Sequence, residues 1–279
     1  MEKFELTKAG IEGLACAYIL ESDSINRMLL EPGRRLLGYE RQKAAFAATV
    51  SWLAAMKEQG YFPGDSMDLC TVTIMAEAAG HNLSGALGAV LSASADRAIY
   101  RGDNWIGASR FALSSRADEG YLNYDARVTY LRLHSPAPVW CLLDTVATGA
   151  TLVRGLEAAF ENAAKPSRII MSTPAGAWVG MRKLEELCLR NGIEFIVTFF
   201  GAAFGLWEDG SGLPWCHPQT ILAGTPRSQA NLARAKVLFN NNPAFCAVGD
   251  CSANFFDVQA ALDNLVEEEE KLGWVLPDN

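Results

Sequence analysis

The stretch VWCLLDTVATGATL, residues 139–152, joins five apolar residues to an acid and then to a loop of small residues and hydroxyls. An apolar run of this length, ended by polar and glycine residues, predicts a buried strand at 139–143. Apolar residues then recur every three or four positions from Leu152 onward, which predicts an amphipathic helix over 152–164. The stretch therefore predicts a strand, a loop and a helix in succession, which is the repeating unit of a parallel sheet.

The same alternation continues on both sides of this unit. Further strands are predicted at 68–80, 167–174 and 193–200, and further helices over 41–59, 83–95 and 179–190. Segment 96–132 is polar and interrupted by glycines, so we expect short strands and a flexible loop there. Alternating strands and helices imply right-handed crossovers, and hence an α/β fold in which helices cover both faces of a parallel sheet.

The length of 279 residues, half of them hydrophobic, is enough for one large core. We expect a single domain over 1–279, with an N-terminal helical segment over about 1–60. No apolar run approaches the roughly 18–20 residues that a membrane span requires. The N-terminus has no apolar stretch typical of a secretory signal, so we expect a cytoplasmic protein without a membrane partner.

The net charge argues against a nucleic-acid-binding protein, and the cysteine content argues against a metal site built from cysteines. The net charge of −8 argues against a nucleic-acid partner, because such binding depends on basic patches. Seven cysteines, without a CxxC pair, are expected to be mostly buried and reduced. Cys246 with Cys251, or Cys216 beside His217, could bind a metal, but only three histidines are present and this alternative has little support.

The loop after the predicted strand at 139–143 has the composition of an anion-binding site. Backbone N–H groups and the N-terminus of the following helix can converge on a phosphate there, with two threonine hydroxyls as further donors. The loop residues are Ala147, Thr148, Gly149, Ala150 and Thr151. Asp144, at the end of the strand, could accept hydrogen bonds from sugar hydroxyls. The loop has neither of the glycine-rich patterns of nucleoside triphosphate and dinucleotide sites, so a small anion attached to a polyol fits better.

The stretch LLDTVATGATL resembles the phosphoribosyl pyrophosphate (PRPP) loop of type I phosphoribosyltransferases, and the wider chain resembles their uracil phosphoribosyltransferase branch. Five further segments resemble that branch in order and in approximate spacing, from about residue 30 to residue 258. They are LLGYE (36–40), DRAIYRGD (96–103), VTYLRLHSPAP (128–138), STPAG (172–176) and VGDCSANFF (248–256). The resemblance implies a parallel sheet with helices on both faces and a small hood, contributed by about 201–248, that closes over the nucleobase.

The resemblance also implies roles for particular residues. Residues 147–151 would hold the 5′-phosphate, and Asp144 with Thr145 the ribose. Arg101 would approach the pyrophosphate, and Asp250 would orient the pyrophosphate or its Mg²⁺, which makes Asp144, Arg101 and Asp250 the expected catalytic residues. The acceptor would lie near Gly210, Gly212, Leu213, Pro214, Trp207 and Trp215.

The implied reaction displaces pyrophosphate from PRPP by a ring nitrogen of a uracil-like or other aromatic acceptor. Such catalysis depends on positioning and on charge stabilisation at the leaving group, with Mg²⁺ as a clamp. Members of the family usually pair, and the N-terminal third carries apolar helix surface, so we also expect a homodimer.

The sequence departs from the family pattern on the pyrophosphate side. Glu77 stands close to the position where the family has an arginine, and a carboxylate there would repel pyrophosphate unless a cation intervened. Thr145 and Ala150 also differ from the usual loop residues. These departures leave a second reading open: a non-catalytic regulator of the same fold that binds PRPP or a nucleotide. A third reading, a chance match of the loop in an unrelated α/β enzyme, predicts no affinity for PRPP.

Several side chains have a structural alternative to a role in binding. Trp207, Trp215 and His217 could stack on a planar acceptor or simply pack the hood. Arg97 is expected to be an ordinary surface arginine, and His81 a capping or loop residue.

Overall fold

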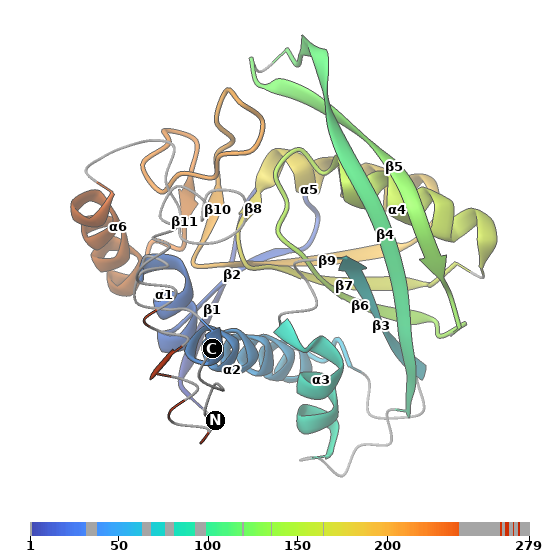
Figure 1. Cartoon of the computed structure of the whole chain (residues 1–279), viewed down its shortest axis with the longest axis horizontal. Coiled ribbons are helices and arrows are strands. Elements are labelled where there is room, and N and C mark those ends of the chain that lie inside the picture. Colours follow the sequence, from blue (N-terminus) through green and yellow to red (C-terminus); the bar gives the residue numbers. More distant parts are fainter. Residues whose placement is uncertain are drawn as a thin grey trace, which may run out of the picture.

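The structure, a computed structural model, describes residues 2–31, 38–62, 68–75, 81–92, 99–118, 120–134, 136–163 and 165–239, together with isolated positions at 263, 266–267, 270 and 273. Within these ranges an eight-stranded sheet lies between two groups of helices, and a smaller sheet adjoins it (Figure 1).

The large sheet has the order β1-β2-β9-β7-β6-β3-β4-β5. The strands are β1 (Phe4–Lys8), β2 (Ala17–Ser22), β3 (Asp68–Met75), β4 (Ile99–Arg116), β5 (Leu122–Arg132), β6 (Val139–Leu143), β7 (Arg168–Thr173) and β9 (Glu194–Phe200). The six inner strands, β2, β9, β7, β6, β3 and β4, are parallel to one another. The edge strands β1 and β5 pair antiparallel with β2 and β4. The predicted α/β class is therefore confirmed, with antiparallel strands at both edges.

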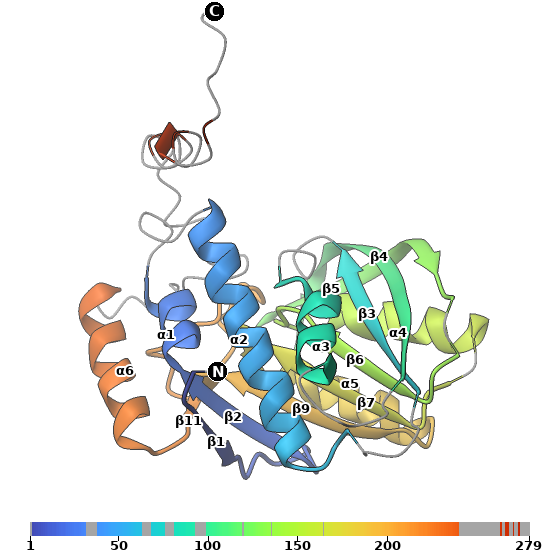
Figure 2. The same ribbon diagram turned by 90° about the horizontal axis from the view of Figure 1, so that it is seen from below.

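Helices cover both faces of this sheet, as Figures 1 and 2 show. The helices are α1 (Asp23–Leu30), α2 (Gly38–Glu58), α3 (Leu83–Ser92), α4 (Ala150–Asn162), α5 (Trp178–Arg190) and α6 (Pro226–Leu238). In Figure 1, α2 and α3 lie below the sheet and α4 and α5 above it. Each face is covered by apolar helix surface, which explains why the central strands are buried throughout.

Strand β6 shows how one strand serves both cores. Val139, Cys141 and Leu143 belong to the core under α2 and α3, whereas Trp140 and Leu142 belong to the core under α4 and α5. This division follows from the two-residue period of a strand, whose successive side chains point to opposite faces. All five residues are buried, so the apolar run in the sequence correctly predicted a strand covered on both sides.

The predicted helices and central strands agree with the structure to within a few residues. The end of α2 shows why a helix boundary can be predicted from the sequence. Gly60 adopts a left-handed conformation with φ of 77° and donates its N–H to the carbonyl of Lys57 at 2.9 Å. The next N–H, of Tyr61, reaches back to Met56 O at 3.0 Å. Glycine suits this position because it has no Cβ, so a glycine after an amphipathic run marks the helix end.

The first 60 residues are not the purely helical segment that we expected. Residues 4–8 and 17–22 form an antiparallel hairpin, β1 and β2, and β2 pairs with β9 in the large sheet. Helices α1 and α2 follow the hairpin in the described N-terminal segment. The strands were missed because β1 is short and half-exposed, and because an apolar run such as that in β2 does not by itself distinguish strand from helix.

Segment 96–132 also differs from the expected short strands and flexible loop. It holds a long hairpin in which β4 has 18 residues and β5 has 11. The hairpin extends beyond the sheet, so both faces are partly exposed and no strict alternation of apolar and polar residues marks it. Two of the glycines that suggested a loop have positive φ, Gly102 at an irregularity in the strand pairing and Gly120 in the turn, and Gly107 lies inside β4.

A three-stranded sheet of β8 (Gly176–Ala177), β10 (Ala202–Phe204) and β11 (Ile221–Leu222) forms the base of the hood. None of the described helices is both long and apolar enough to cross a membrane. The large apolar side chains of α1 and α2 that the structure describes pack inside the molecule, so they no longer support the expected homodimer, which stays a prediction.

Candidate functional site

The loop over residues 144–149 follows β6 at the carboxyl edge of the parallel strands, where ligands bind in open α/β sheets. The connection from β7 to α5 holds this loop in place. The N–H of Asp144 donates to the carbonyl of Ser172 at 3.2 Å. Val146 donates its N–H to Ala175 O at 3.0 Å and accepts from the N–H of Ala177 at 2.7 Å. The loop thus behaves as a short continuation of the sheet.

Two glycines allow the loop to approach α5 closely. Gly149 has φ of 79°, and a Cβ placed there would lie 2.7 Å from the carbonyl oxygen of Gly180. A Cβ on Gly180 would lie 2.2 Å from the carbonyl oxygen of Ala147 and 3.0 Å from the nitrogen of Gly149. A side chain at either position would force the loop away from the first turn of α5, so the two glycines fix its shape.

Helix α4 begins at Ala150, two residues before the predicted start, because Gly149 acts as its N-cap in the left-handed conformation. Gly149 provides no side-chain cap to the first turn of the helix. The N–H groups of that turn therefore keep their capacity to bind an external acceptor, and the helix dipole adds partial positive charge. This is the arrangement that binds phosphate groups at helix N-termini.

A cavity of about 50 Å³ lies against this loop, and its lining combines the predicted residues with one arginine. The lining residues are Arg110, Asp144, Thr145, Val146, Ala147, Thr148, Gly149, Ala150, Thr151 and Leu152. All residues predicted to hold phosphate and ribose thus border one cavity. Asp144 and Thr148 are buried, and the hydroxyl of Thr145 has no hydrogen-bond partner among the described residues.

Arg110 was not predicted from the sequence. Strand β4 continues to Arg116, well past Gly107, the last position that pairs with β3, and Arg110 lies three residues past Gly107, over the carboxyl edge of the sheet. Its guanidinium carbon lies 5.2 Å from the centre of the Tyr124 ring in β5. Only a correct prediction of the long hairpin could have placed this arginine beside the loop.

Arg101, the predicted pyrophosphate ligand, lies at the opposite edge of the sheet. It is near the start of β4, and its Nε is 3.0 Å from a carboxylate oxygen of Asp68, at the start of β3. Arg110 lies nine positions further along the strand, which corresponds to roughly 30 Å along an extended chain. The structure therefore does not bring Arg101 to the loop, because parallel strands place their first and last residues at different edges.

Of the residues predicted to bind the acceptor, one lines a cavity and the others are structural residues of the hood. Trp215 is 2% exposed and makes an edge-to-face contact with Phe204 at 5.2 Å between ring centres, so it is a core residue. Leu213 is 1% exposed, and Pro214 is buried. Among the predicted acceptor residues, Trp207 alone lines the hood cavity described below.

Gly210 and Gly212 belong to a tight turn beside the β4–β5 hairpin. Gly210 has φ of 70°, and a Cβ there would lie 2.3 Å from the carbonyl oxygen of Leu122. Asp209 accepts hydrogen bonds from the N–H groups of Ser211 and Gly212, both at 2.8 Å. The turn is thus a structural contact between the hood and the hairpin.

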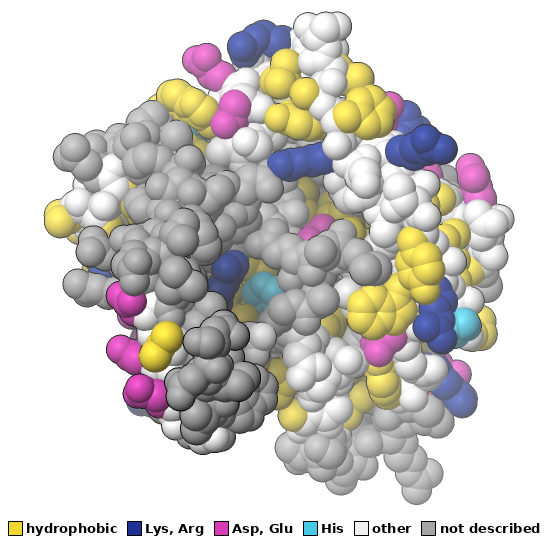
Figure 3. All heavy atoms as spheres, in the orientation of Figure 1, with side chains coloured by type: hydrophobic (Ala, Val, Ile, Leu, Met, Phe, Trp, Pro, Cys, Tyr) yellow, Lys and Arg dark blue, Asp and Glu magenta, His cyan; other side chains and the backbone are white. Residues whose placement is uncertain are grey.

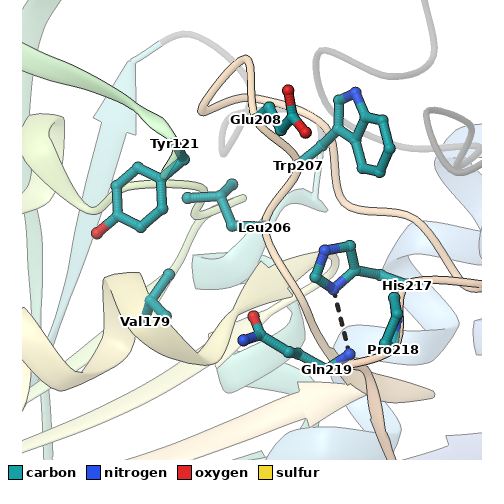
Figure 4. Close-up of a pocket in the computed structure, with 8 residues that line it drawn as sticks. All are labelled: Tyr121, Val179, Leu206, Trp207, Glu208, His217, Pro218 and Gln219. Carbon is teal, nitrogen blue, oxygen red and sulfur yellow. Dashed lines mark hydrogen bonds between the residues drawn. The ribbon is translucent and has the colours of Figure 1, made fainter. Parts of the chain in front are cut away.

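A second cavity, which we call the hood cavity, has a volume of about 280 Å³ (Figure 4). Its lining residues are Tyr121, Val179, Leu206, Trp207, Glu208, His217, Pro218 and Gln219. Val179 precedes Gly180, whose backbone lies close to Ala147 and Gly149, so the first turn of α5 lines the hood cavity and contacts the loop over residues 144–149. The hairpin and the hood meet at this cavity, because Leu122 donates its N–H to the carbonyl of Glu208 at 2.9 Å.

His217 has a defined protonation state in this cavity. Its Nδ1 accepts a hydrogen bond from the N–H of Gln219 at 3.2 Å, and the imidazole lies edge-to-face with Trp207 at 6.1 Å between ring centres. Partial burial lowers the pKa of His217, which favours the neutral ring at pH 7. A neutral imidazole that accepts at Nδ1 carries its proton on Nε2.

His81 lies just before α3 and is deeply buried, at 5% exposure. Burial, together with the positive charge of Arg41, lowers its pKa to about 4, so the ring is neutral at pH 7. Its Nδ1 has no hydrogen-bond partner among the described residues.

Three residues weighed in the sequence, Asp250, Glu77 and Arg97, lie outside the described residues. Of the seven cysteines, five are described and all are free; Cys70, Cys141 and Cys188 are buried. Burial raises the pKa of the Cys188 thiol to about 12, as is typical of an unreactive thiol. Within the described part of the chain, no group of three His, Cys, Asp or Glu side chains could hold a metal ion.

The space-filling view shows basic and apolar side chains interspersed over the hairpin side of the molecule (Figure 3). The exposed apolar residues there include Phe111, at 49% exposure, and Tyr130, at 45%. The hairpin thus differs from the net acidic character of the whole chain.

No protein-family model and no curated protein sequence matches the chain. Solved structures of phosphoribosyltransferases resemble it distantly. Adenine phosphoribosyl transferase from Trypanosoma brucei, solved with AMP, pyrophosphate and ribose-5-phosphate, is 10% identical, with a TM-score of 0.41 over 70% of this chain and 87% of that one.

Hypoxanthine-guanine phosphoribosyl transferase from L. donovani is 16% identical, with a TM-score of 0.34, over 57% of this chain and 79% of that one. Adenine phosphoribosyltransferase from Thermoanaerobacter pseudethanolicus is 14% identical, with a TM-score of 0.31, over 57% of this chain and 85% of that one. None of these similarities singles out the uracil branch that the sequence motifs resemble.

Proposed function

We propose that this protein transfers a phosphoribosyl group from PRPP to a nitrogen of a small aromatic acceptor and releases pyrophosphate. The observation that carries the proposal is the loop after β6, where ten residues, including the sequence that resembles a PRPP loop, border one cavity at the N-terminus of α4. The chemistry of this lining suits a phosphate attached to a sugar, since it combines backbone donors, hydroxyls and one carboxylate.

Each part of the loop has a separate task in this mechanism. The N–H groups at the start of α4 and the hydroxyls of Thr148 and Thr151 hold the 5′-phosphate. Asp144 accepts hydrogen bonds from the ribose hydroxyls and stabilises the positive charge that develops on the ribose in the transition state. Because no covalent nucleophile is required, the chain contributes by positioning the reactants and by balancing charge.

Arg110 takes the role that the sequence assigned to Arg101. A guanidinium at the edge of the loop cavity can donate two N–H hydrogen bonds to phosphate oxygens and so stabilise the departing pyrophosphate. The ring nitrogen of the acceptor forms a bond to the ribose carbon as the bond from that carbon to pyrophosphate breaks.

Mg²⁺ would accompany PRPP rather than occupy a site made by the described chain alone. The described residues contain no cluster of three metal ligands, so the pyrophosphate oxygens are the main ligands we propose, with Asp250 as a contributor from outside the described residues. When bound, Mg²⁺ would neutralise charge on the leaving pyrophosphate.

The alternative function is that of a non-catalytic regulator that binds PRPP or a nucleotide. Glu77, in the segment where the family has an arginine, favours this alternative, because a carboxylate there would repel pyrophosphate. Pyrophosphate release with an acceptor supports the enzyme, whereas tight binding without turnover supports the regulator.

The first experiment is a calorimetric titration of the full chain with PRPP in millimolar Mg²⁺. The variant Thr148→Val removes one phosphate donor at nearly constant volume and should weaken binding by about 1–3 kcal/mol, the scale for a hydrogen bond to a charged group. Thr129→Val serves as the matched control, because Thr129 is exposed on β5 and does not line the loop cavity. Unchanged affinity in Thr148→Val, or no PRPP binding by the wild type, would overturn the assignment.

A further inference from the structure

Tyr124, in β5, contacts both Arg110 and the hood. In the hairpin Arg110 pairs with Ala126, and Tyr124 pairs with Ala112, so Arg110 and Tyr124 are diagonal neighbours on one face. The guanidinium carbon of Arg110 lies over the Tyr124 ring, 5.2 Å from its centre, which is within the range of a cation–π contact. Arg110 therefore has an aromatic surface beside it, on the strand that neighbours its own.

The hood fixes the position of the Tyr124 ring through residues 209–212, which we call the hood turn. The hydroxyl of Tyr124 donates a hydrogen bond to the carbonyl of Asp209 at 3.1 Å. Gly210 approaches the ring so closely that a Cβ there would lie 2.8 Å from Cε2 of Tyr124. The side chain of Asp209 closes the turn by accepting hydrogen bonds from two backbone N–H groups, both at 2.8 Å. The ring thus rests against a turn that has its own hydrogen bonds.

The backbone of β5 is anchored on both sides of Tyr124. Two residues earlier, Leu122 donates its N–H to the carbonyl of Glu208 at 2.9 Å, where the hairpin meets the hood (Figure 1). The next residue, Asp125, accepts a hydrogen bond from Nε of Arg154 at 2.9 Å. Arg154 belongs to α4, the helix that begins at the loop after β6. Tyr124 is therefore placed between an attachment to the hood and one to the helix that begins at the loop.

These contacts matter for Arg110 because its side chain is long and exposed. A flexible side chain loses rotamer freedom when a ligand orders it, and this entropic cost lowers the affinity. A ring that already holds the guanidinium reduces this cost before the ligand binds. The N–H groups of a guanidinium lie in its plane, so a contact through its face leaves them able to donate to an anion. Because Arg110 borders the loop cavity, the anion would lie there.

We propose that Tyr124 is a positioning residue, which holds the guanidinium of Arg110 at the loop cavity and connects it to the hood turn. Anion binding at the loop then depends on a contact with the hood that lies outside the cavity lining. This inference rests on the proposed function for the identity of the anion, PRPP, whereas the contacts of Tyr124 are independent of it.

The first test is a double-mutant cycle of Tyr124→Leu and Arg110→Met. The full chain is titrated calorimetrically with PRPP and with inorganic pyrophosphate, each in millimolar Mg²⁺. Tyr124→Leu should weaken binding about two- to fivefold, the factor expected for an exposed cation–π contact. In the Arg110→Met background it should have no further effect, because the side chain that it positions is gone.

Tyr130→Leu is the matched control for this cycle. Tyr130 is exposed on the same strand and lines neither cavity, so its replacement should leave the affinity unchanged. Unchanged affinity in Tyr124→Leu would overturn the inference. Equal weakening in the presence and in the absence of the Arg110 side chain would also overturn it, because Tyr124 would then act through another part of the structure.

The second test disturbs the hood turn and leaves Tyr124 in place. Gly210→Ala puts a methyl group against the Tyr124 ring and should weaken PRPP binding by a similar factor. Gly224→Ala is the control, because φ is 77° at Gly224 and 70° at Gly210, but no atom lies within 4 Å of a Cβ at Gly224. Circular dichroism checks that both variants are folded. Unchanged affinity in a folded Gly210→Ala, or an equal loss in Gly224→Ala, would overturn the connection to the hood turn.

The outcomes separate this inference from the proposed function. PRPP binding that depends on Thr148 and Arg110, with unchanged affinity in Tyr124→Leu, would remove the role of Tyr124 and leave the proposed function intact. Pyrophosphate binding that depends on Arg110 and Tyr124, without PRPP binding, would remove the transferase and leave the positioning role intact. Binding of neither probe by the wild type would overturn both.

Discussion

The loop after β6 and the hood cavity lie on two sides of the same helical turn, but they are constructed differently. Consecutive residues form the loop, and the close approach of Gly149 to Gly180 fixes its backbone. The hood cavity takes its eight lining residues from the hairpin, from α5 and from two parts of the hood. A site made from the backbone depends on local geometry, whereas a site made from distant side chains depends on the packing that brings them together.

The largest effect is expected from replacing Trp215, a core residue of the hood. Trp215→Ala should lower the free energy of unfolding by about 3–5 kcal/mol, because a fully buried indole leaves a large cavity. Trp207→Ala should cost much less, since Trp207 is only partly buried and lines an open space. Urea denaturation followed by circular dichroism measures both. Equal losses of unfolding free energy in the two variants would mean that Trp215 contributes no more to stability than Trp207.

If the loop is an independent unit, Trp215→Ala should retain PRPP affinity at temperatures where the variant is folded. A large loss of PRPP affinity in that variant would break the comparison, because the loop would then depend on hood packing.

Arg110 is the one lining residue of the loop cavity that comes from a distant strand. Arg110→Met, which keeps the aliphatic stem, should weaken PRPP binding by about 1.5–3 kcal/mol through loss of charged hydrogen bonds. Arg101→Met is the matched control, because Arg101 pairs with Asp68 at the other edge of the sheet and should leave the affinity unchanged. Calorimetric titration distinguishes the two. Weaker PRPP binding by Arg101→Met, with unchanged binding by Arg110→Met, would instead support the role that the sequence motif gave to Arg101.

Helix α5 lines the hood cavity and contacts the loop, and a buried carboxylate on this helix affects stability in a pH-dependent way. Glu185 is 4% exposed, accepts a hydrogen bond from the backbone of Ala15, and leaves Oε2 without a partner among the described residues. Burial raises the pKa of Glu185, so its contribution to stability is fully present below the unfolded pKa of about 4.3 and is lost as the pH rises through the folded pKa.

Glu185→Gln should therefore raise the free energy of unfolding by about 1 kcal/mol at pH 8 and change it little near pH 4, since the amide keeps an acceptor without a buried charge. Glu186→Gln, at the exposed neighbouring position, should show no such pH dependence. Denaturation midpoints at both pH values check this. A Glu185→Gln effect of equal size at pH 4 and pH 8 would show that the carboxylate is not the cause.

The features that the sequence predicted well are those determined by consecutive residues. The strand at 139–143 was predicted because burial on both faces produces an unbroken apolar run, and the helix after the loop because its apolar residues recur every three or four positions. The position of Arg110 and the hood cavity were not predicted. Their residues meet only through the extension of β4 past β3 and the contact of the hairpin with the hood, which no local pattern encodes.

The location of Arg101 was not predicted for the same reason. A motif can align an arginine with a functional position, but the edge of the sheet at which it lies depends on where its strand begins. Strand β4 begins beside Asp68, at the amino edge of β3, and this start placed Arg101 away from the loop.

The strand order also determines when the molecule can be completed during its synthesis. Strand β2, buried along its whole length, has β9 as its parallel neighbour, and β9 ends at Phe200. At about 5–20 residues per second, a ribosome needs roughly ten seconds or more to make the intervening chain. Throughout that interval the N-terminal hairpin lacks its partner and exposes an apolar strand to solvent or to chaperones, so release of the nascent chain before β9 would yield a fragment prone to aggregate.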